Sequence, residues 1–305
     1  MKTFWKILSR VLIVIVALIA LIIGSIPADV LIGGGRVEAV ANTRIPNGDG
    51  PEILAYVAYP TSAGPHPVVI MVHEFWGLNQ EIVGRAEALA QEGYLVVAPS
   101  IFRGKASNWI PSAIYQTAST PQSQITRDLD AVFIWLSSQP KVRSDRIAIL
   151  GFCFGGRTSL LYSLSNKKLA ATVVFYGPPV VDVDQLRSLS GSVLGIYGGA
   201  DISISEADVI AFEAALNKAG VSNQISIYKD QPHAFVTVEG IRQNGSPSQQ
   251  AWKQAIKFLN QNLQKNDSVL RQVTQTQAAN ATDWGYLLRL AYEHTLGLII
   301  GHHQS

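Results

Sequence analysis

Residues 146–165 read RIAILGFCFGGRTSLLYSLS, and this stretch decides the class of fold. Residues 146–150 form a mostly apolar run that predicts a buried β-strand. Residues 154–165 have the length and composition of a helix, and only residues 151–153 lie between the two elements. A strand that passes almost directly into a helix is typical of α/β proteins.

The same alternation of short apolar strands and helices continues on both sides of this stretch. Strands are expected at residues 53–59, 68–72, 94–98, 146–150, 169–176, 192–197 and 224–228. Helices are expected at 80–92, 121–136, 154–165, 205–218 and 248–263, with a long loop at 100–120. This order predicts an α/β fold with a mostly parallel sheet and helices on both faces. Reactive groups in such sheets lie at the carboxyl ends of the strands.

Composition excludes several classes of protein. Hydrophobic residues make up 48% of the 305-residue chain and charged residues 15%, which is the opposite of a disordered sequence. One cysteine excludes a disulfide-stapled domain. The net charge is +2, and no run of Lys and Arg is longer than a pair, so no nucleic-acid partner is expected.

The N-terminus carries a membrane-targeting pattern. Lys2, Lys6 and Arg10 precede an uncharged apolar stretch, residues 11–28, which ends at Asp29. We interpret residues 1–32 as a transmembrane anchor. The alternative is a signal segment cleaved after Ala28, leaving a secreted or periplasmic protein. Under either interpretation the positive flank stays in the cytoplasm, so the rest of the chain is expected to be extracytoplasmic.

Two further regions follow this segment. Residues 33–263 are expected to form the α/β domain. Residues 264–305 are expected to form a polar linker rich in Gln, Asn, Thr and Ser, then a helix at 284–300 with Asp283 as its N-cap. Arg289, Glu293 and His294 argue against a second membrane span. This helix is expected to pack on its own domain, or else to lie at the membrane surface.

The single cysteine lies in the sequence Gly151-Phe152-Cys153-Phe154-Gly155. This is the nucleophile-elbow pattern G-x-S-x-G with Cys in place of Ser. The pattern needs glycines because the strand and the helix approach closely on either side of the turn. The positive end of the following helix stabilises a thiolate. The plainer alternative is a buried, inert cysteine.

A nucleophile of this kind needs a base and a group that orients the base. Asp201 follows the strand expected at 192–197, and His233 follows the strand expected at 224–228. Both therefore fall at strand ends, in the chain order nucleophile, acid, histidine that the elbow pattern requires. Asp182 and Asp184 are rival acids, but they follow a proline-containing loop rather than a clean strand end.

Four segments in this order resemble the dienelactone hydrolase family of α/β-hydrolases. They are HEFWG at 73–77, GFCFGG at 151–156, YGGAD at 197–201 and PHAF at 232–235. The resemblance covers roughly residues 42–263 and implies an α/β-hydrolase fold with a Cys153–His233–Asp201 triad. No metal or other cofactor is expected, since the mechanism needs none and no clustered ligand motif is visible. The membrane segment and the polar tail lie outside the family pattern.

The resemblance also implies that Glu74 contacts the thiol and governs when it ionises. The backbone N–H groups of Phe154 and Phe75 would form the oxyanion hole. Without this resemblance, Glu74 would be interpreted as a surface carboxylate at a strand end. His73 is expected to hold its loop by hydrogen bonding.

Substrate-binding residues are less well defined. Family members commonly carry an Asp after the proline that ends the third strand, and a substrate-binding Arg soon after. Here Ser100 replaces that Asp, and Arg103 lies one residue short of the expected spacing. Arg103 is a candidate for binding a substrate carboxylate, and Trp76 and Tyr176 are further candidates. The loop expected at 104–120 can roof the pocket.

The predicted activity is hydrolysis of a small-molecule ester or lactone through a thioester acyl-enzyme. A broad carboxylesterase or a thioesterase on the same fold remains an alternative, because the pocket walls and not the triad select the substrate. A non-catalytic, membrane-tethered binding module would be marked by a missing triad member, and a redox sensor would need a partner thiol. The natural substrate and the oligomeric state are left open.

Overall fold

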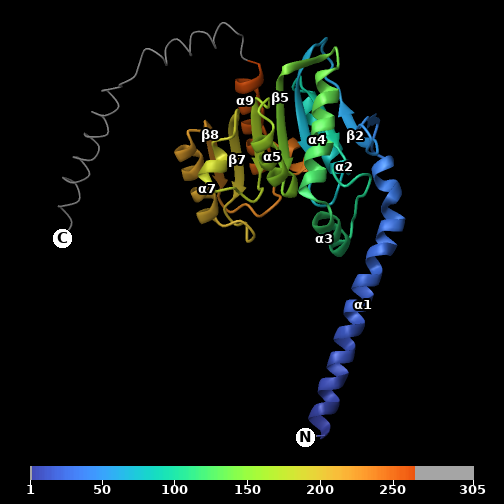
Figure 1. Ribbon diagram of the computed structural model, residues 1–305. Coiled ribbons are helices and arrows are strands. Elements are labelled where there is room, and N and C mark those ends of the chain that lie inside the picture. The colour runs from blue at the N-terminus through green and yellow to red at the C-terminus, as the bar shows by residue number, and fades with distance from the viewer. Residues whose placement is uncertain (1, 265–305) are drawn as a thin grey trace, which may run out of the picture. The chain divides into compact units, whose positions relative to one another are not determined.

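The computed structural model describes residues 2–264, and a single eight-stranded sheet lies at its centre (Figure 1). The strand order is β1-β2-β4-β3-β5-β6-β7-β8. Their bounds are β1 (Thr43–Ile45), β2 (Ile53–Ala58), β3 (His66–Val72), β4 (Leu95–Pro99), β5 (Val142–Phe152), β6 (Ala171–Phe175), β7 (Ser192–Gly198) and β8 (Asn223–Tyr228). Only the pairs β1–β2 and β2–β4 are antiparallel. The prediction of a mostly parallel sheet is confirmed.

Helices cover both faces of this sheet. Helices α2 (Gln80–Ala90) and α9 (Pro247–Leu263) share one buried cluster with Val69 and Met71 of β3. Helix α4 (Gln122–Ser137) packs on the other face, where it meets Val68, Ile70 and Val72. Helices α5 (Phe154–Ser165) and α7 (Glu206–Ala219) share a third cluster with β6 and β7. Since alternate residues of β3 face opposite sides and both sides are buried, the strand is a continuous apolar run.

Three short helices and one short strand depart from the sequence-based expectation. The region expected as a loop contains α3 (Ile110–Ser119), and β1, α6 (Val183–Leu186) and α8 (Val238–Arg242) were not predicted. The physical reason is clearest for α3. Its buried residues are Ser112, Ala113 and Gln116, while Ile110 and Ile114 are exposed, so the face that it packs on the domain carries no large apolar residue.

The N-terminal helix α1 runs without interruption from Lys2 to Glu38. Its segment Phe4–Asp29 contains an 18-residue window with a mean hydropathy of 3.0 and is long and apolar enough to cross a membrane. The expected boundary at residue 32 falls inside this helix. Val37, in its last turn, is fully buried in the cluster beneath α2 and α9. The helix expected at 284–300 lies outside the described residues.

Candidate active site

Cys153 lies on a strained turn between β5 and α5. Its φ of 53° and ψ of −116° place a non-glycine residue in a region that L-amino acids rarely adopt. A Cβ on Gly151 would lie 2.1 Å from the carbonyl oxygen of Gly155, and a Cβ on Gly155 would lie 2.3 Å from that of Val72. The turn can therefore close only because both positions lack a side chain.

Asp201 and His233 follow β7 and β8 and are directly hydrogen-bonded. His233 Nδ1 lies 2.6 Å from Asp201 Oδ2. The other carboxylate oxygen, Oδ1, accepts hydrogen bonds from Ser203 N (2.8 Å), Ser203 Oγ (2.6 Å) and Ile204 N (3.2 Å). Burial alone would raise the pKa of Asp201, but the hydrogen bonds from Ser203 and His233 outweigh it and hold this pKa below its ordinary value.

An ionised Asp201 fixes the tautomer of His233. Since the carboxylate accepts a hydrogen bond from the Nδ1–H group, the opposite ring nitrogen, Nε2, is left for the substrate. The ring of Tyr176 lies edge-on to the imidazole, with 5.2 Å between the centroids. His233 is thus held by an ionic hydrogen bond on one side and by an aromatic ring on another.

Cys153 and His233 line the same pocket, which has a volume of about 480 Å³. Its lining consists of Phe75, Thr117, Cys153, Phe154, Arg157, Pro178, Ser203, Ile204 and His233. Among the described residues, no hydrogen bond joins the thiol to the imidazole. Catalytic hydrogen bonds are often long in unliganded enzymes and tighten only when substrate binds. The pocket therefore has both the thiol of Cys153 and the imidazole of His233 in its wall.

The thiol of Cys153 is neutral at rest. Burial is the main cause that raises its pKa to about 11; the negative charges of Glu74 and Asp201 contribute in the same direction, and the backbone N–H of Phe154 acts in the opposite direction. At neutral pH the sulfur therefore carries its proton, unlike the thiolate of a cysteine paired with a charged histidine.

The pH dependence of the alkylation rate of Cys153 is expected to reflect this high pKa. Below a pKa of about 11 the thiolate fraction grows tenfold per pH unit, so the rate with iodoacetamide should climb steadily from pH 7 to 10. An unperturbed thiol levels off above about pH 8.5. Intact-mass analysis can follow the reaction without interference, because the chain has one cysteine.

A variant of Glu74 separates the contribution of burial to the pKa of Cys153 from the contribution of nearby charge. Glu74→Gln removes one of the charges that raise the pKa of the thiol, so alkylation at pH 8 should become faster. The exposed Glu239 provides a matched control, and Glu239→Gln should leave the rate unchanged. A wild-type rate that is already flat at pH 7 would show a preformed thiolate and contradict this prediction.

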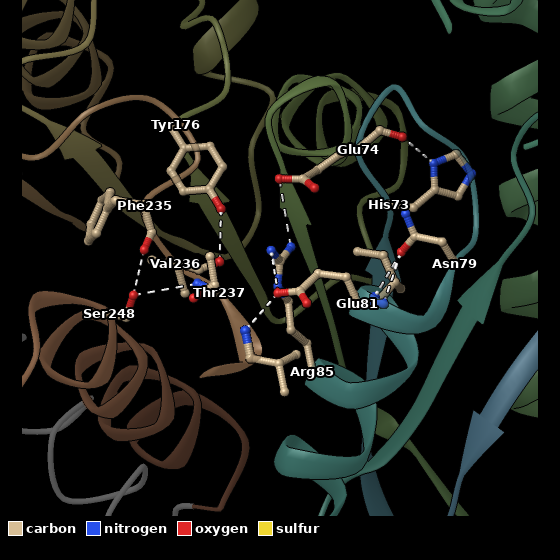
Figure 2. A network of polar contacts seen from close by, with 12 residues as sticks. His73, Glu74, Asn79, Glu81, Arg85, Tyr176, Phe235, Val236, Thr237 and Ser248 are labelled. Atoms are coloured by element: carbon tan, nitrogen blue, oxygen red, sulfur yellow. Dashed lines mark hydrogen bonds and ion pairs between the residues drawn. The ribbon is translucent and has the colours of Figure 1, made fainter. Parts of the chain in front are cut away.

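Glu74 lies at the carboxyl end of β3, where its carboxylate faces Arg85 of α2 (Figure 2). The distance from Glu74 Oε1 to Arg85 Nη1 is 3.7 Å, and neither atom makes a hydrogen bond within the described residues. Arg85 also pairs with Glu81 at 3.2 Å and stacks over the ring of Phe152 at 4.2 Å. Because no hydrogen bond links Glu74 to the thiol in the described residues, it acts on Cys153 through its charge.

His73 has a structural role, as predicted. Its ring is fully buried, and Nδ1 lies 2.7 Å from the carbonyl oxygen of Glu74 while the N–H of Ile101 donates to Nε2 at 3.0 Å. Burial lowers the pKa of His73 to about 4, so the ring is neutral. Both ring nitrogens are used to join the two loops that follow β3 and β4.

The two proposed oxyanion-hole residues meet at the pocket. Phe154 is the first residue of α5, and its N–H is directed at the sulfur of Cys153. The carbonyl oxygen of Phe75 accepts a hydrogen bond of 2.6 Å from Gln116 Nε2. No acceptor for the N–H of Phe75 is found among residues 2–264. The N–H of Phe75 is therefore open to a ligand, and that of Phe154 lies beside the sulfur.

Arg103 and Trp76 lie outside this pocket. The Nε and Nη2 atoms of Arg103 each donate to a carboxylate oxygen of Asp128 at 3.0 Å, so its guanidinium is already paired. The carbonyl oxygen of Trp76 accepts a hydrogen bond of 2.9 Å from the N–H of Ser107. The indole ring of Trp76 packs against the ring of Phe75, with 4.3 Å between the centroids. Neither residue lines the cavity that contains Cys153.

Tyr176 and the two rival acids, Asp182 and Asp184, have other positions than a substrate-binding or triad role would require. Tyr176 is fully buried and supports the imidazole instead of lining the cavity. Asp182 is the N-cap of α6, and Asp184 is exposed and pairs with Arg187. Neither carboxylate replaces Asp201 beside His233.

Sequence reasoning missed the polar residues that complete the pocket. Ser203 bridges the pair, since its Oγ lies 3.3 Å from His233 Nδ1 as well as bonding to Asp201. Arg157 Nη1 donates to the carbonyl oxygens of Pro178 (3.1 Å) and Pro179 (2.6 Å). The sequence spacing of both residues could have indicated their positions. Ser203 follows Asp201 by two residues, the spacing of an Asx-turn, and Arg157 lies one helical turn after Cys153. Within the described part of the chain, no cluster of side chains suited to a metal ion is present.

A cysteine on a glycine-flanked turn, with an Asp–His pair beyond it at the next strand ends of a parallel sheet, is the arrangement of an α/β-hydrolase. The model of the "Dienelactone hydrolase family" matches residues 53–263. The chain belongs to this family.

Individual relatives agree with the family. A "Putative carboxymethylenebutenolidase" of Salmonella typhimurium is 38% identical over 208 residues, covering 63% of this chain and 76% of the relative. A protein of the same name from Escherichia coli K12 is 34% identical over 234 residues, covering 72% and 86%. The chain is therefore a hydrolase of the kind that acts on ester or lactone bonds.

Solved structures give the same result for the fold. A crystal structure from Klebsiella pneumoniae, described as a "Putative Dienelactone Hydrolase", matches with a TM-score of 0.65 and 30% identity, over 73% of this chain and 98% of the other. A dienelactone hydrolase-like promiscuous phosphotriesterase from metagenomic libraries matches with a TM-score of 0.63. At 22% identity over 72% of this chain and 96% of the other, that match concerns the fold alone.

Proposed function

We propose that the chain hydrolyses a small-molecule ester or lactone through a Cys153–His233–Asp201 triad and a thioester acyl-enzyme. The observation that carries this proposal is the 2.6 Å Asp201–His233 hydrogen bond at the pocket that also contains Cys153. An imidazole oriented in this way, beside a thiol on an elbow turn, is the arrangement required for nucleophilic catalysis.

The first half-reaction acylates the enzyme. Nε2 of His233 takes the thiol proton, and Sγ attacks the carbonyl carbon. The N–H groups of Phe154 and Phe75 stabilise the resulting oxyanion, at about 3 kcal/mol per donor. The carbon–oxygen bond then breaks, and His233 returns its proton to the departing alcohol or enolate. Asp201 stabilises the charged imidazole between these two transfers.

Glu74 controls when the thiol ionises. Its charge helps to keep Cys153 neutral at rest, and its only ionic contact within the described residues is the 3.7 Å pair with Arg85. A substrate that displaces or neutralises this carboxylate removes one cause of the raised pKa. The sulfur then becomes nucleophilic only when a substrate is bound.

The second half-reaction releases the acid. His233 takes a proton from water, and the hydroxyl attacks the thioester carbonyl. The carbon–sulfur bond breaks, Cys153 recovers its proton from the imidazolium, and the carboxylic acid leaves. A broad carboxylesterase or a thioesterase would use the same steps, since the triad acts on the carbonyl group and not on the rest of the substrate. A non-catalytic binding module is disfavoured because all three triad residues are present.

We also propose that α1 anchors the hydrolase domain to a membrane, on its extracytoplasmic side. Support comes from the segment Phe4–Asp29, which is apolar and contains no buried residue. Further support comes from a hydrogen bond that joins the segment before Ala28, after which a signal peptide would be cleaved, to the domain, and from a second one just after that point. Trp109 Nε1 donates to Ser25 Oγ at 2.9 Å, and Ser107 Oγ donates to Asp29 Oδ2 at 2.6 Å. The alternative is a cleaved signal that leaves a secreted or periplasmic protein.

A substrate panel with trapping of the intermediate tests the proposed reaction. Lactones, aryl esters and acyl thioesters would be mixed with the enzyme, quenched in acid within milliseconds and examined by intact-mass and peptide mass spectrometry. We expect a mass increase equal to the acyl group, confined to the peptide that contains Cys153. Cleavage of acyl thioesters alone would favour the thioesterase alternative. Turnover with no adduct at Cys153, under conditions where deacylation limits the rate, would contradict the thioester intermediate.

A further inference from the structure

We propose that α3 lies on the membrane surface and that the active site takes its ester from the lipid bilayer. The occupant of the exposed face of α3 is a phospholipid surface, and the substrate class is an ester or lactone with an apolar chain dissolved in that surface. The substrate part of this inference rests on the proposed function, and the docking part rests on α1 as an anchor.

Helix α3 has its apolar residues on the outside. Ile110, Ile114 and Tyr115 are 55%, 57% and 53% exposed, and Trp109, which precedes the helix, is 44% exposed. The residues that face the domain are Ser112, Ala113 and Gln116. Single exposed apolar residues are ordinary on soluble proteins, but an inverted amphipathic helix is not. A tryptophan and a tyrosine beside aliphatic residues are typical of helices that lie at the membrane–water interface.

The contacts between α3 and α1 fix the depth of this face. Trp109 is hydrogen-bonded to Ser25, and Ser107, two residues earlier, is hydrogen-bonded to Asp29, where the apolar segment ends. Figure 1 shows α3 beside α1. Ser25 precedes Asp29 by one helical turn, about 6 Å along the axis. Interfacial helices bury their apolar face by about 5–10 Å, so α3 lies at the depth that lipid contact requires.

The same helix forms part of the active-site wall. Thr117, in its last turn, lines the pocket that contains Cys153 and His233. The side chain of Gln116 donates to the carbonyl oxygen of Phe75, whose N–H is one of the proposed oxyanion-hole donors. One wall of the pocket is therefore built by the element that would contact lipid. An ester dissolved in the bilayer would have a short path to the sulfur.

The experiment uses the full chain in phosphatidylcholine vesicles that contain phosphatidylglycerol. Intact mass first establishes that residues 1–28 are present. Hydrolysis of water-soluble 4-nitrophenyl acetate is then compared with hydrolysis of a long-chain 4-nitrophenyl ester dissolved in the vesicles. The test variant is the double substitution Ile110→Gln with Ile114→Gln. The matched control is Ile210→Gln on α7, a residue that is 59% exposed and belongs to a different helix.

We expect the double variant to lose about tenfold or more in kcat/KM for the vesicle ester, the ratio that corresponds to about 1.4 kcal/mol of lost lipid contact. Its rate with 4-nitrophenyl acetate should stay within about twofold of wild type, because neither isoleucine lines the pocket. Ile210→Gln should change neither rate. Equal losses on both esters, or no loss on the vesicle ester, would overturn the substrate part of the proposal.

A second measurement follows docking without catalysis. Lipids brominated near the headgroup quench tryptophans that lie at the interface, and the quenching should fall when Trp109 is replaced by Phe. Unchanged quenching in Trp109→Phe, or a mature protein that begins at Asp29, would overturn the docking part. A wild-type protein that hydrolyses neither ester would contradict the proposed function and the substrate part together, while the quenching result would still decide docking.

Discussion

Cys153→Ala is expected to reduce kcat/KM for an activated aryl ester by about four orders of magnitude or more, as losses of a nucleophile do in triad hydrolases. The sulfur is the atom that forms the acyl bond, and alanine offers nothing in its place. Initial rates with 4-nitrophenyl esters would measure the effect. The residual rate should be that of hydrolysis aided by binding and the oxyanion hole alone.

The fold should survive this substitution. Cys153 has a φ of 53°, which strains alanine about as much as cysteine, so the elbow turn gains no new clash. Circular dichroism and the thermal midpoint should therefore match wild type. Cys153→Ser provides the matched control, because a hydroxyl ionises far less readily than a thiol and should leave only weak activity. An alanine variant that kept the wild-type rate would remove Cys153 from the mechanism.

Asp201→Asn is expected to lower kcat by about 10³–10⁴-fold, with little change in fold. The asparagine amide would donate to Nδ1 of His233 instead of accepting from it, so the ring proton would move to Nε2. That nitrogen could then no longer accept a proton from the thiol or from water. The carbonyl oxygen of the new side chain can still accept the hydrogen bonds that Ser203 and Ile204 now give to Oδ1.

Asp182→Asn is the matched control for this effect. Asp182 caps α6 through Oδ1, a bond that asparagine can also accept, so its substitution should leave kcat within about twofold. Steady-state rates over a range of pH would measure both variants. If Asp201→Asn kept more than about a tenth of wild-type activity, the role of Asp201 in orienting the imidazole would be contradicted.

The parts of the fold that are buried on both sides could be predicted from the sequence. Strands β3, β4 and β6 are short and mostly apolar, because each is buried on both faces of the sheet. The positions of Cys153, Asp201 and His233 followed from the same reasoning, since parallel strands bring their carboxyl ends to one edge. These predictions needed only local patterns and one rule of topology.

The remaining features depend on contacts between distant parts of the chain. Arg103 was a candidate for binding substrate, but its guanidinium is paired with Asp128 of α4. Because the two residues lie 25 positions apart in the sequence, no local pattern predicts this pair. Helix α3 was expected as a loop, and it packs on the domain through Ser112, Ala113 and Gln116 and not through large apolar residues. The neutral thiol could not be foreseen either, since an elbow at a helix N-terminus suggests a lowered pKa. Burial and the charges of Glu74 and Asp201 reverse that expectation.

The protonated state of Cys153 affects how readily its sulfur is oxidised. The thiolate and not the thiol attacks hydrogen peroxide or the disulfide of an oxidising catalyst, so sulfenic acid and mixed disulfides form slowly on a cysteine whose pKa is about 11. On the extracytoplasmic side of a membrane, where we propose that the hydrolase domain lies, no glutathione pool would repair such damage. Keeping Cys153 in its unreactive form between turnovers would allow a sulfur nucleophile to persist in an oxidising compartment.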